Sequence, residues 1–119
     1  MQGYPSQLAQ VFTNLLVNAC HAIEERQKIE KHYEGRVFLR SDIDGSQLLI
    51  HVTDNGCGMP EHVQKRLFEP FFTTKGADKG TGLGMGICRG IIERHGGKLL
   101  VNSTEGEGTT MTVSLPIPT

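Results

Sequence analysis

The chain has 119 residues, the size of one ordinary domain, and its 37% hydrophobic and 21% charged residues allow a packed core and argue against disorder. Its formal net charge of -1 disfavours a sequence-independent nucleic-acid binder, which would carry a basic excess. Three widely spaced cysteines without a Cys-x-x-Cys pair indicate reduced thiols in a cytosolic setting, neither a disulfide framework nor a zinc site. No apolar run approaches the roughly 20 residues that span a bilayer, and we expect no signal peptide.

The first half of the chain predicts a long helix and a hairpin. Apolar residues recur at spacings of three and four through residues 7–27, which indicates an amphipathic helix with Ser6 as its N-cap. Two apolar, β-branched segments follow at 37–43 and 47–54, and the Asp-Gly-Ser sequence between them predicts a tight turn. A glycine-rich break then leads into a short helix at 61–68.

The second half predicts a loop, a second long helix and another strand pair. Residues 69–82 show no periodicity and read as loop, whereas the apolar spacing from Leu83 onward predicts a helix that ends at Gly96-Gly97. Strands are expected at 98–103 and 109–115. Because the strand pairs are segregated rather than alternating with helices, we expect an α+β two-layer sandwich with helices on one face of a mixed sheet, in a single domain over 1–119.

Four motifs stand in order along the chain: NLLVNACHA at 14–22, DNGCGMP at 54–60, FEPFFTTK at 68–75 and GTGLGMG at 80–86. Together they resemble the N, G1, F and G2 boxes of the ATP-binding catalytic domain of sensor histidine kinases, in wording nearest to the nitrogen-regulation and oxygen-sensing kinases. The closing GGKLLVNSTEGEGTTMTVSLP resembles that family's last hairpin. The resemblance covers nearly the whole chain and implies the same two-layer sandwich, with a mobile lid over ATP.

Two asparagines of the first helix lie four residues apart, which puts both amides on one face. By resemblance Asn18 is the Mg²⁺ ligand, and an amide oxygen suits this hard cation, which also keeps water and phosphate oxygens. Asn14 stands where related ATPases carry a glutamate base, and an amide cannot take up that proton at neutral pH. Phosphoryl transfer to a protein is therefore favoured over ATP hydrolysis. An ordinary polar helix contact is the alternative for each.

The adenine end of the expected site follows the second strand of the first hairpin. By resemblance Asp54 accepts a hydrogen bond from the adenine amino group, and an ionised carboxylate, which offers only acceptors, suits that contact. Gly56 and Gly58 lack Cβ atoms and would let the backbone approach the base, with Met59 lining its pocket. Thr109, at the start of the last strand, is expected to hold the adenine directly or through water.

The phosphate end of the expected site is rich in glycine. Free backbone N–H groups at the start of the second long helix attract phosphates, and the segment after Lys75 is expected to move to admit ATP. The glycines fit neither the P-loop pattern nor the Rossmann pattern, and no strand leads directly into them. His21 and Lys75 either contact phosphates or are solvated side chains.

The resemblance thus implies a protein that binds Mg-ATP and passes the γ-phosphate to a histidine on a separate dimerisation domain, upstream of a response regulator. No histidine here has an H-[ED]-x-x-[NT]-P context, so we expect a fragment that does not autophosphorylate. Dimerisation in this family belongs largely to the separate helical domain, so we expect the fragment to be monomeric. We also expect it to be cytoplasmic, without nucleic-acid binding or membrane contact, whether or not the full-length protein is membrane-anchored. A serine/threonine kinase of the anti-sigma-factor type and a non-catalytic nucleotide-gated module are the alternatives. The expected catalytic residues are Asn14, Asn18 and Lys75, and the expected nucleotide contacts are Asn14, Asn18, His21, Asp54, Gly56, Gly58, Met59, Phe72, Thr74, Lys75, Gly80, Gly82, Leu83, Gly84, Met85 and Thr109.

Overall fold

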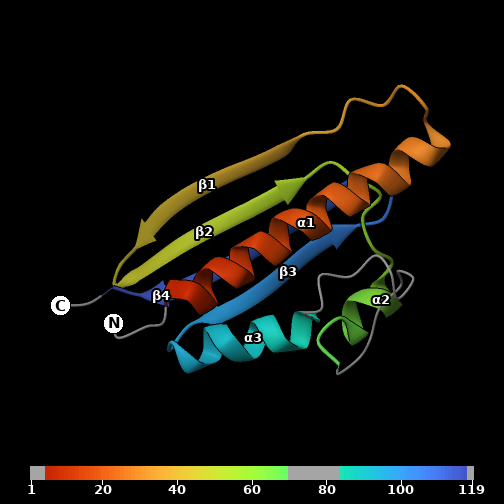
Figure 1. The fold of residues 1–119 in the computed structure, drawn as a ribbon. Helices are drawn as coiled ribbons and strands as arrows, with labels where there is room; N and C mark the ends of the chain where they lie inside the picture. The colour runs from red at the N-terminus through yellow and green to blue at the C-terminus, as the bar shows by residue number, and fades with distance from the viewer. Residues whose placement is uncertain (1–4, 70–83, 118–119) are drawn as a thin grey trace.

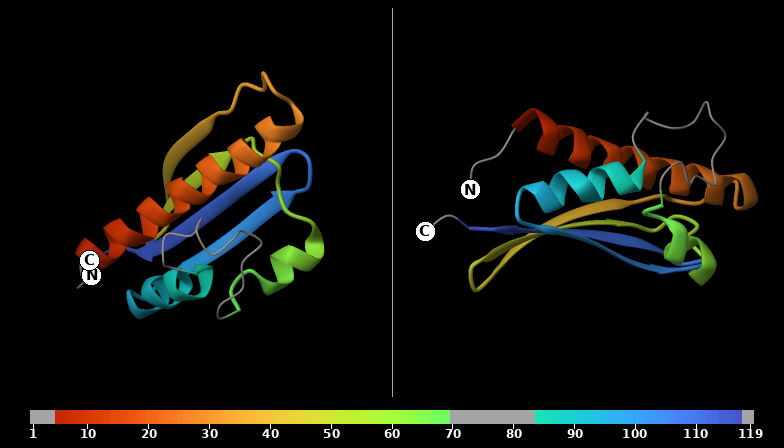
Figure 2. Two further views of the ribbon diagram at one scale, coloured as in Figure 1. Left: turned by 45° about the vertical axis from the view of Figure 1, so that its right-hand side comes forward. Right: turned by 90° about the horizontal axis from the view of Figure 1, so that it is seen from below.

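The computed structural model describes residues 5–69 and 84–117, and within them the helices and strands form two layers (Figure 1, Figure 2). The predicted order of elements and the α+β two-layer sandwich are confirmed, while nearly all of the predicted loop at 69–82 lies outside the described residues. The elements are α1 (Pro5–Ile29), β1 (Val37–Asp44), β2 (Gln47–Asp54), α2 (Glu61–Arg66), α3 (Met85–Arg94), β3 (Lys98–Thr104) and β4 (Gly108–Pro116).

The described strands form one sheet in the order β1-β2-β4-β3, and every neighbouring pair is antiparallel. The prediction of a mixed sheet is therefore wrong for these strands. The physical reason is the position of β4. Strands β2 and β3 run in the same direction, as in a helix-connected parallel unit, but β4 lies between them and pairs antiparallel with both.

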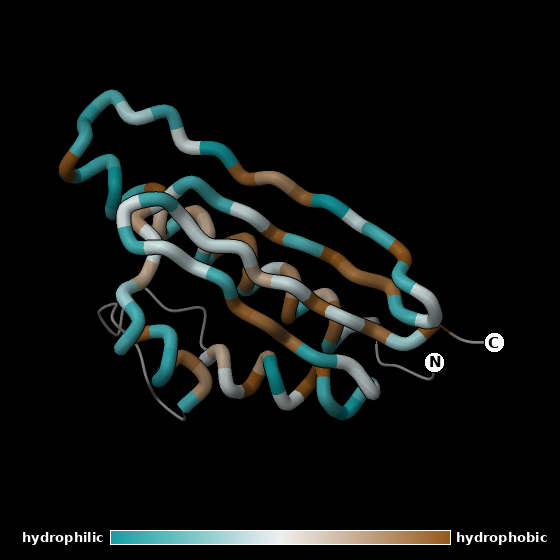
Figure 3. Tube along the Cα trace, turned by 180° about the vertical axis from the view of Figure 1, so that it is seen from behind, coloured by the Kyte–Doolittle hydropathy of each residue, from teal (hydrophilic) through white to brown (hydrophobic). Residues whose placement is uncertain are grey.

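The core lies between the sheet and the two longer helices. Along β4 the buried and half-buried residues alternate, and the buried set faces α1 and α3. Figure 3 shows the matching alternation along β4, whereas the neighbouring strands carry continuous apolar stretches. The least exposed core side chains are Val11, Leu15, Cys88, Ile92, Val52 and Val113. Burying one such aliphatic side chain stabilises the fold by about 1.5–3 kcal/mol, so the predicted apolar stripes account for the helix positions.

The helix ends depart slightly from expectation. Helix α1 begins at Pro5, so Ser6 lies in its first turn and is not its N-cap. A proline suits this place because the first-turn N–H groups have no partner within the helix. Helix α3 stops at Arg94, and the N–H of Gly97 returns to the carbonyl of Ile92, which confirms the predicted end at the glycine pair. None of the helices in the described ranges is both long and apolar enough to cross a membrane.

Strand β1 forms one edge of the sheet and is exposed at all eight residues. Its large apolar side chains stay accessible: Phe38 is 56%, Leu39 is 63% and Ile43 is 72% exposed. Between this strand and α1 lies an open apolar groove of about 350 Å³, to which Phe12 and Leu39 contribute. The groove lies near the edge of the sheet that β1 forms, and β3 forms the other edge.

Candidate nucleotide-binding site

The face of α1 that carries the two asparagines turns toward α3. Asn14 is only 1% exposed, and its amide nitrogen donates to Cys88 Sγ at 3.2 Å. One turn later, Asn18 Nδ2 lies 3.8 Å from Met85 Sδ at the start of α3. The predicted placement of both amides on one helix face is confirmed. This buried hydrogen bond links α1 to α3. Burial raises the pKa of the Cys88 thiol, and the hydrogen bond from Asn14 opposes that rise.

Asp54 is a buried acid at the end of β2. It is 7% exposed, and its Oδ1 accepts a hydrogen bond from the Gly56 N–H at 2.8 Å. Thr109 is its register partner on β4 and is equally buried. Burial raises the pKa of the Asp54 carboxyl above its ordinary value, and the backbone N–H groups of Gly56 and Thr109 oppose that rise. The structure thus brings together the acid and the threonine that the sequence assigns to adenine.

The glycines of the turn that follows Asp54 are required by packing against protein. A Cβ at Gly56 would lie 2.6–2.8 Å from three atoms of Ala22 on α1. A Cβ at Gly58, whose φ is 68°, would overlap the carbonyl oxygen of Thr104. The Cys57 N–H also donates to the Ala22 carbonyl at 3.1 Å. Glycine therefore allows the turn to lie directly on α1 and on the β3 end, a reason different from the expected approach to the base.

A cluster on the outer side of the turn holds Asn55. The Arg26 guanidinium donates to the carbonyls of Asn55 and Gly56 at 3.3 and 3.2 Å, and it stacks 4.0 Å from the Tyr33 ring centroid. The Tyr33 hydroxyl donates to the Asn55 carbonyl at 2.8 Å, and the Arg36 N–H donates to Asn55 Oδ1 at 2.7 Å. The sequence patterns do not single out these residues, because they come from a charged stretch that resembles ordinary solvated surface.

A second cluster on the inner side centres on Ser103, another residue that the motifs do not indicate. Its hydroxyl oxygen lies 2.9 Å from the Met59 nitrogen, 3.0 Å from the Gly108 carbonyl and 2.8 Å from Thr109 Oγ1. Gln64 on α2 donates to the carbonyls of Met59 and Ser103 at 2.8 and 2.9 Å. A signal was present in the sequence: the turn between β3 and β4 sets a register that places position 103 opposite position 109.

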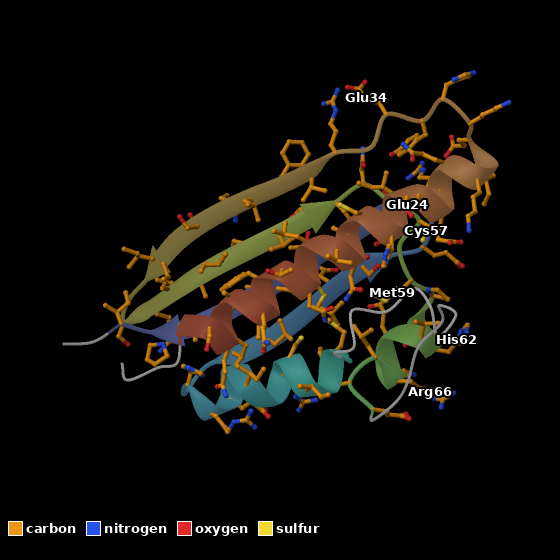
Figure 4. The ribbon with its side chains drawn as sticks, in the orientation of Figure 1. Glu24, Glu34, Cys57, Met59, His62 and Arg66 are labelled. Carbon is orange, nitrogen blue, oxygen red and sulfur yellow. The ribbon has the colours of Figure 1, made fainter. Side chains whose placement is uncertain are left out.

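Figure 4 shows how the turn meets the helices: Cys57 lies beside the C-terminal half of α1, and Met59 lies between α1 and α2. His21, on α1 between Asn18 and Ala22, has a buried Nδ1 without a hydrogen-bond partner among the described residues. A buried polar atom without a partner is costly, and a polar ligand against this face would satisfy it. The described residues hold no group of three or more His, Cys, Asp or Glu side chains suited to a metal. A cation here would rely on Asn18 together with phosphate and water oxygens, as Mg²⁺ usually does.

The start of α3 is the described part of the expected phosphate end. Its N-cap is Gly84, which has no side chain with which to cap the helix, and its first residue is Met85. The contact between Met85 and Asn18 brings this helix end to the asparagine face of α1. The remaining expected contacts, which lie outside the described residues, are Phe72, Thr74, Lys75, Gly80, Gly82 and Leu83.

Comparison with known proteins places this arrangement in a family. The family model described as "Histidine kinase-, DNA gyrase B-, and HSP90-like ATPase" matches residues 3–119. The chain is 41% identical over 114 residues to sporulation kinase E of Bacillus subtilis (strain 168), covering 95% of this chain and 14% of that protein. It is 44% identical over 110 residues to the signal transduction histidine-protein kinase AtoS of Escherichia coli (strain K12), covering 92% and 17%. It therefore spans less than a fifth of either relative.

A solved structure agrees with the sequence relatives. The catalytic domain of histidine kinase ThkA, in a nucleotide-free form, superposes with a TM-score of 0.76 at 33% identity, over 96% of this chain and 68% of that one. The resemblance that the four motifs indicate is thereby confirmed. The chain belongs to the family of histidine kinase-, DNA gyrase B- and HSP90-like ATPases, and within it to the histidine kinase catalytic domains.

Proposed function

We propose that residues 1–119 form the domain of a sensor histidine kinase that binds Mg-ATP and passes its γ-phosphate to a histidine on a separate domain. The observation that carries the proposal is one continuous set of contacts. Asp54 and Thr109 end the sheet, the turn after Asp54 lies on Ala22, and the same α1 carries Asn18 against the start of α3. We infer that a base and a phosphate chain would lie along that path.

At the adenine end, selectivity follows from which groups can donate. An ionised Asp54 offers only acceptors, and the exocyclic amino group of adenine offers donors. Guanine and hypoxanthine place a carbonyl at the same position, which would face the carboxylate without a proton between the two oxygens. The wall of the turn is formed by Gly58 and Met59, whose backbone is tied to β3 through Ser103.

At the phosphate end, Asn18 would hold Mg²⁺ through its amide oxygen, and the ion would supply charge neutralisation for the phosphates. The unpartnered Nδ1 of His21 would gain a phosphate or water contact on the same face. Asn14, an amide where a base would be needed, leaves attacking water without activation. Lys75 remains the proposed third catalytic residue.

The nucleophile belongs to another part of the pathway. No histidine of this chain has the sequence context of a phosphoacceptor. We therefore place the acceptor on a dimerisation domain of the full-length protein, which would pass the phosphate to a response regulator. The domain itself would act in the cytoplasm as a monomer, without nucleic-acid or membrane contact.

Calorimetric titration with a non-hydrolysable ATP analogue, with and without Mg²⁺, tests the binding site. Asp54→Asn should weaken binding at least tenfold, since it costs a charge-assisted hydrogen bond of roughly 1.5–3 kcal/mol. Asn18→Ala should remove the gain from Mg²⁺ and leave the metal-free affinity nearly unchanged. Asp44→Asn, on an exposed acid at the end of β1, is the matched control for the loss of a charge. Binding that is indifferent to both Asp54 and Asn18 would contradict the proposed site.

A transfer assay tests the reaction. The domain is incubated with Mg-ATP and the separately produced acceptor domain of the same full-length protein, and the phosphorylated product is then treated with acid. Phosphohistidine is lost in acid, whereas an acid-stable product would favour the serine/threonine kinase. Tight ATP binding without any transfer would favour the nucleotide-gated binding module.

A further inference from the structure

The inner face of the sheet ends in a row of three polar side chains that crosses three strands. Asp54 on β2 is the register partner of Thr109 on β4, and Thr109 is the register partner of Ser103 on β3. The rows that precede it on this face are apolar, as in Val52, Met111 and Val101. The polar row therefore lies where the core ends and the proposed adenine contact begins.

The protons of this row can be assigned by counting donors. A hydroxyl has one proton and two acceptor lone pairs. The Gly108 carbonyl can only accept a hydrogen bond, so the Ser103 hydroxyl donates its one proton to that carbonyl, at 3.0 Å. The Met59 N–H occupies one lone pair of Ser103. The 2.8 Å contact between Ser103 and Thr109 must then use the proton of Thr109, which donates to the remaining lone pair.

This assignment leaves Thr109 with only acceptor capacity toward a ligand. Its proton is held by Ser103 on the side away from Asp54, and an ionised Asp54 is also an acceptor. A base that meets the row must therefore bring donors. An amino group at position 6 of a purine satisfies both oxygens, directly or through one water, whereas a carbonyl at that position meets acceptors alone.

We propose that Ser103 is a specificity-determining residue of this domain, which acts by fixing the hydroxyl of Thr109 as an acceptor and so favours a 6-amino purine over a 6-oxo purine. The inference rests on the proposed function and goes beyond it, because Ser103 is a positioning residue that acts through Thr109. Without the Ser103 oxygen, the Thr109 hydroxyl can rotate and donate to a carbonyl, which relaxes the discrimination.

The test compares ADP with inosine diphosphate, which differ in that position 6 carries an amino group in one and a carbonyl in the other. Calorimetric titration of the wild-type domain should show a clear preference for ADP. Ser103→Ala should reduce the ADP-to-IDP affinity ratio about three- to tenfold, the range expected for one net hydrogen bond. Ser103→Thr, which keeps the hydroxyl on a strand residue, should restore the ratio.

Two controls separate specificity from stability. Ser114→Ala removes a hydroxyl that donates to Gln47 at the other end of β4, and it should leave the ratio unchanged. In a Thr109→Val background, Ser103→Ala should have no further effect on the ratio, because the hydroxyl through which it acts is gone. Melting temperatures identify any variant that merely loses stability through the Met59 hydrogen bond.

The outcomes are distinct. An unchanged ratio in Ser103→Ala, with ADP still bound, overturns the inference and leaves the proposed function standing. An equal drop of the ratio in the presence and absence of the Thr109 hydroxyl also overturns it. A wild-type domain that binds neither nucleotide overturns the proposed function and the inference together.

Discussion

Gly56→Ala offers a sharp test of how the turn is seated, because the added methyl group has nowhere to go. It would lie 2.6 Å from the carbonyl carbon of Ala22, 2.7 Å from its Cβ and 2.8 Å from its carbonyl oxygen. These atoms belong to the C-terminal half of a 25-residue helix, more than a turn from its end, and cannot rotate away. The backbone of Gly56 does not have a positive φ, so the predicted penalty is steric.

The magnitude follows from two contributions. Overpacking of this kind costs about 1–3 kcal/mol, and pushing the turn off α1 would also break the hydrogen bond from Cys57 to Ala22, worth about 1 kcal/mol. The expected loss is thus about 2–4 kcal/mol of unfolding free energy. A domain of this length typically has roughly 6–18 kcal/mol, so the variant should still fold, with a melting temperature lower by roughly 6–20 °C.

Thermal unfolding followed by circular dichroism measures the effect, and Gly90→Ala is the matched control. A Cβ at Gly90, inside α3, would meet only the end of the Arg94 side chain at 3.5 Å. Replacing an unhindered helix glycine with alanine stabilises by about 0.5–1 kcal/mol, so the two substitutions should shift the melting temperature in opposite directions. An unchanged melting temperature in Gly56→Ala would refute the argument that glycine is required for contact with α1.

Three further predictions concern the acid, the outer cluster and the sheet edge. Burial in the folded state raises the pKa of Asp54, so the protonated carboxyl stabilises the fold. This stabilisation is fully present below pH 3.8, the ordinary pKa of the group, and it is lost as pH rises through the raised pKa. Asp54→Asn should therefore gain stability relative to wild type as pH rises, while it binds ADP at least tenfold more weakly. Thermal unfolding at a series of pH values checks the first point, and a stability difference that is constant with pH contradicts it. Tyr33→Phe, which removes the donor to the Asn55 carbonyl, should cost about 0.5–1.5 kcal/mol in chemical denaturation and weaken ADP binding, and no change in either would be inconsistent with its role. Ile43→Lys, at a 72% exposed edge position, should change stability by less than about 0.5 kcal/mol and slow heat-induced aggregation in light scattering. Marked unfolding would show that Ile43 is part of the core.

The helices and strands were predictable where a periodic pattern of apolar residues forms a single face that packs on the core. The apolar stripe through Val11 and Leu15 predicts α1, and the alternation of Met111, Val113 and Leu115 predicts β4. The sheet order was not predictable in this way. Whether β4 joins β3 from the outer side or inserts beside β2 depends on long-range pairing, and short-range patterns do not encode that choice.

In the candidate site, too, some residues were predictable from local patterns and others depend on tertiary contacts. Asp54 and Thr109 belong to motifs with special residue types, and the sequence indicates them. Ser103 and Tyr33 are common residue types in positions that look like ordinary strand and surface, and their importance arises from what the tertiary fold places beside them. We propose that both act on the site through the backbone of the turn or through another side chain. No motif marks Tyr33, and Ser103 can be found only through the register that the turn between β3 and β4 sets.

The turn between β2 and α2 is tied to four different parts of the fold before any ligand is present. The N–H of Asn55 donates to the carbonyl of Arg36, that of Gly56 to the Asp54 carboxylate, that of Cys57 to α1, and that of Met59 to Ser103. Each bond uses a donor that a flexible turn would offer to water, and those of Cys57 and Met59 anchor the turn to α1 and β3, which the core holds in place. Folding has therefore already met the entropic cost of ordering the base end, which binding would otherwise have to meet. If adenine binds here as we propose, less of the free energy of its contact would be needed to shape the turn, and more of it would appear as affinity and selectivity.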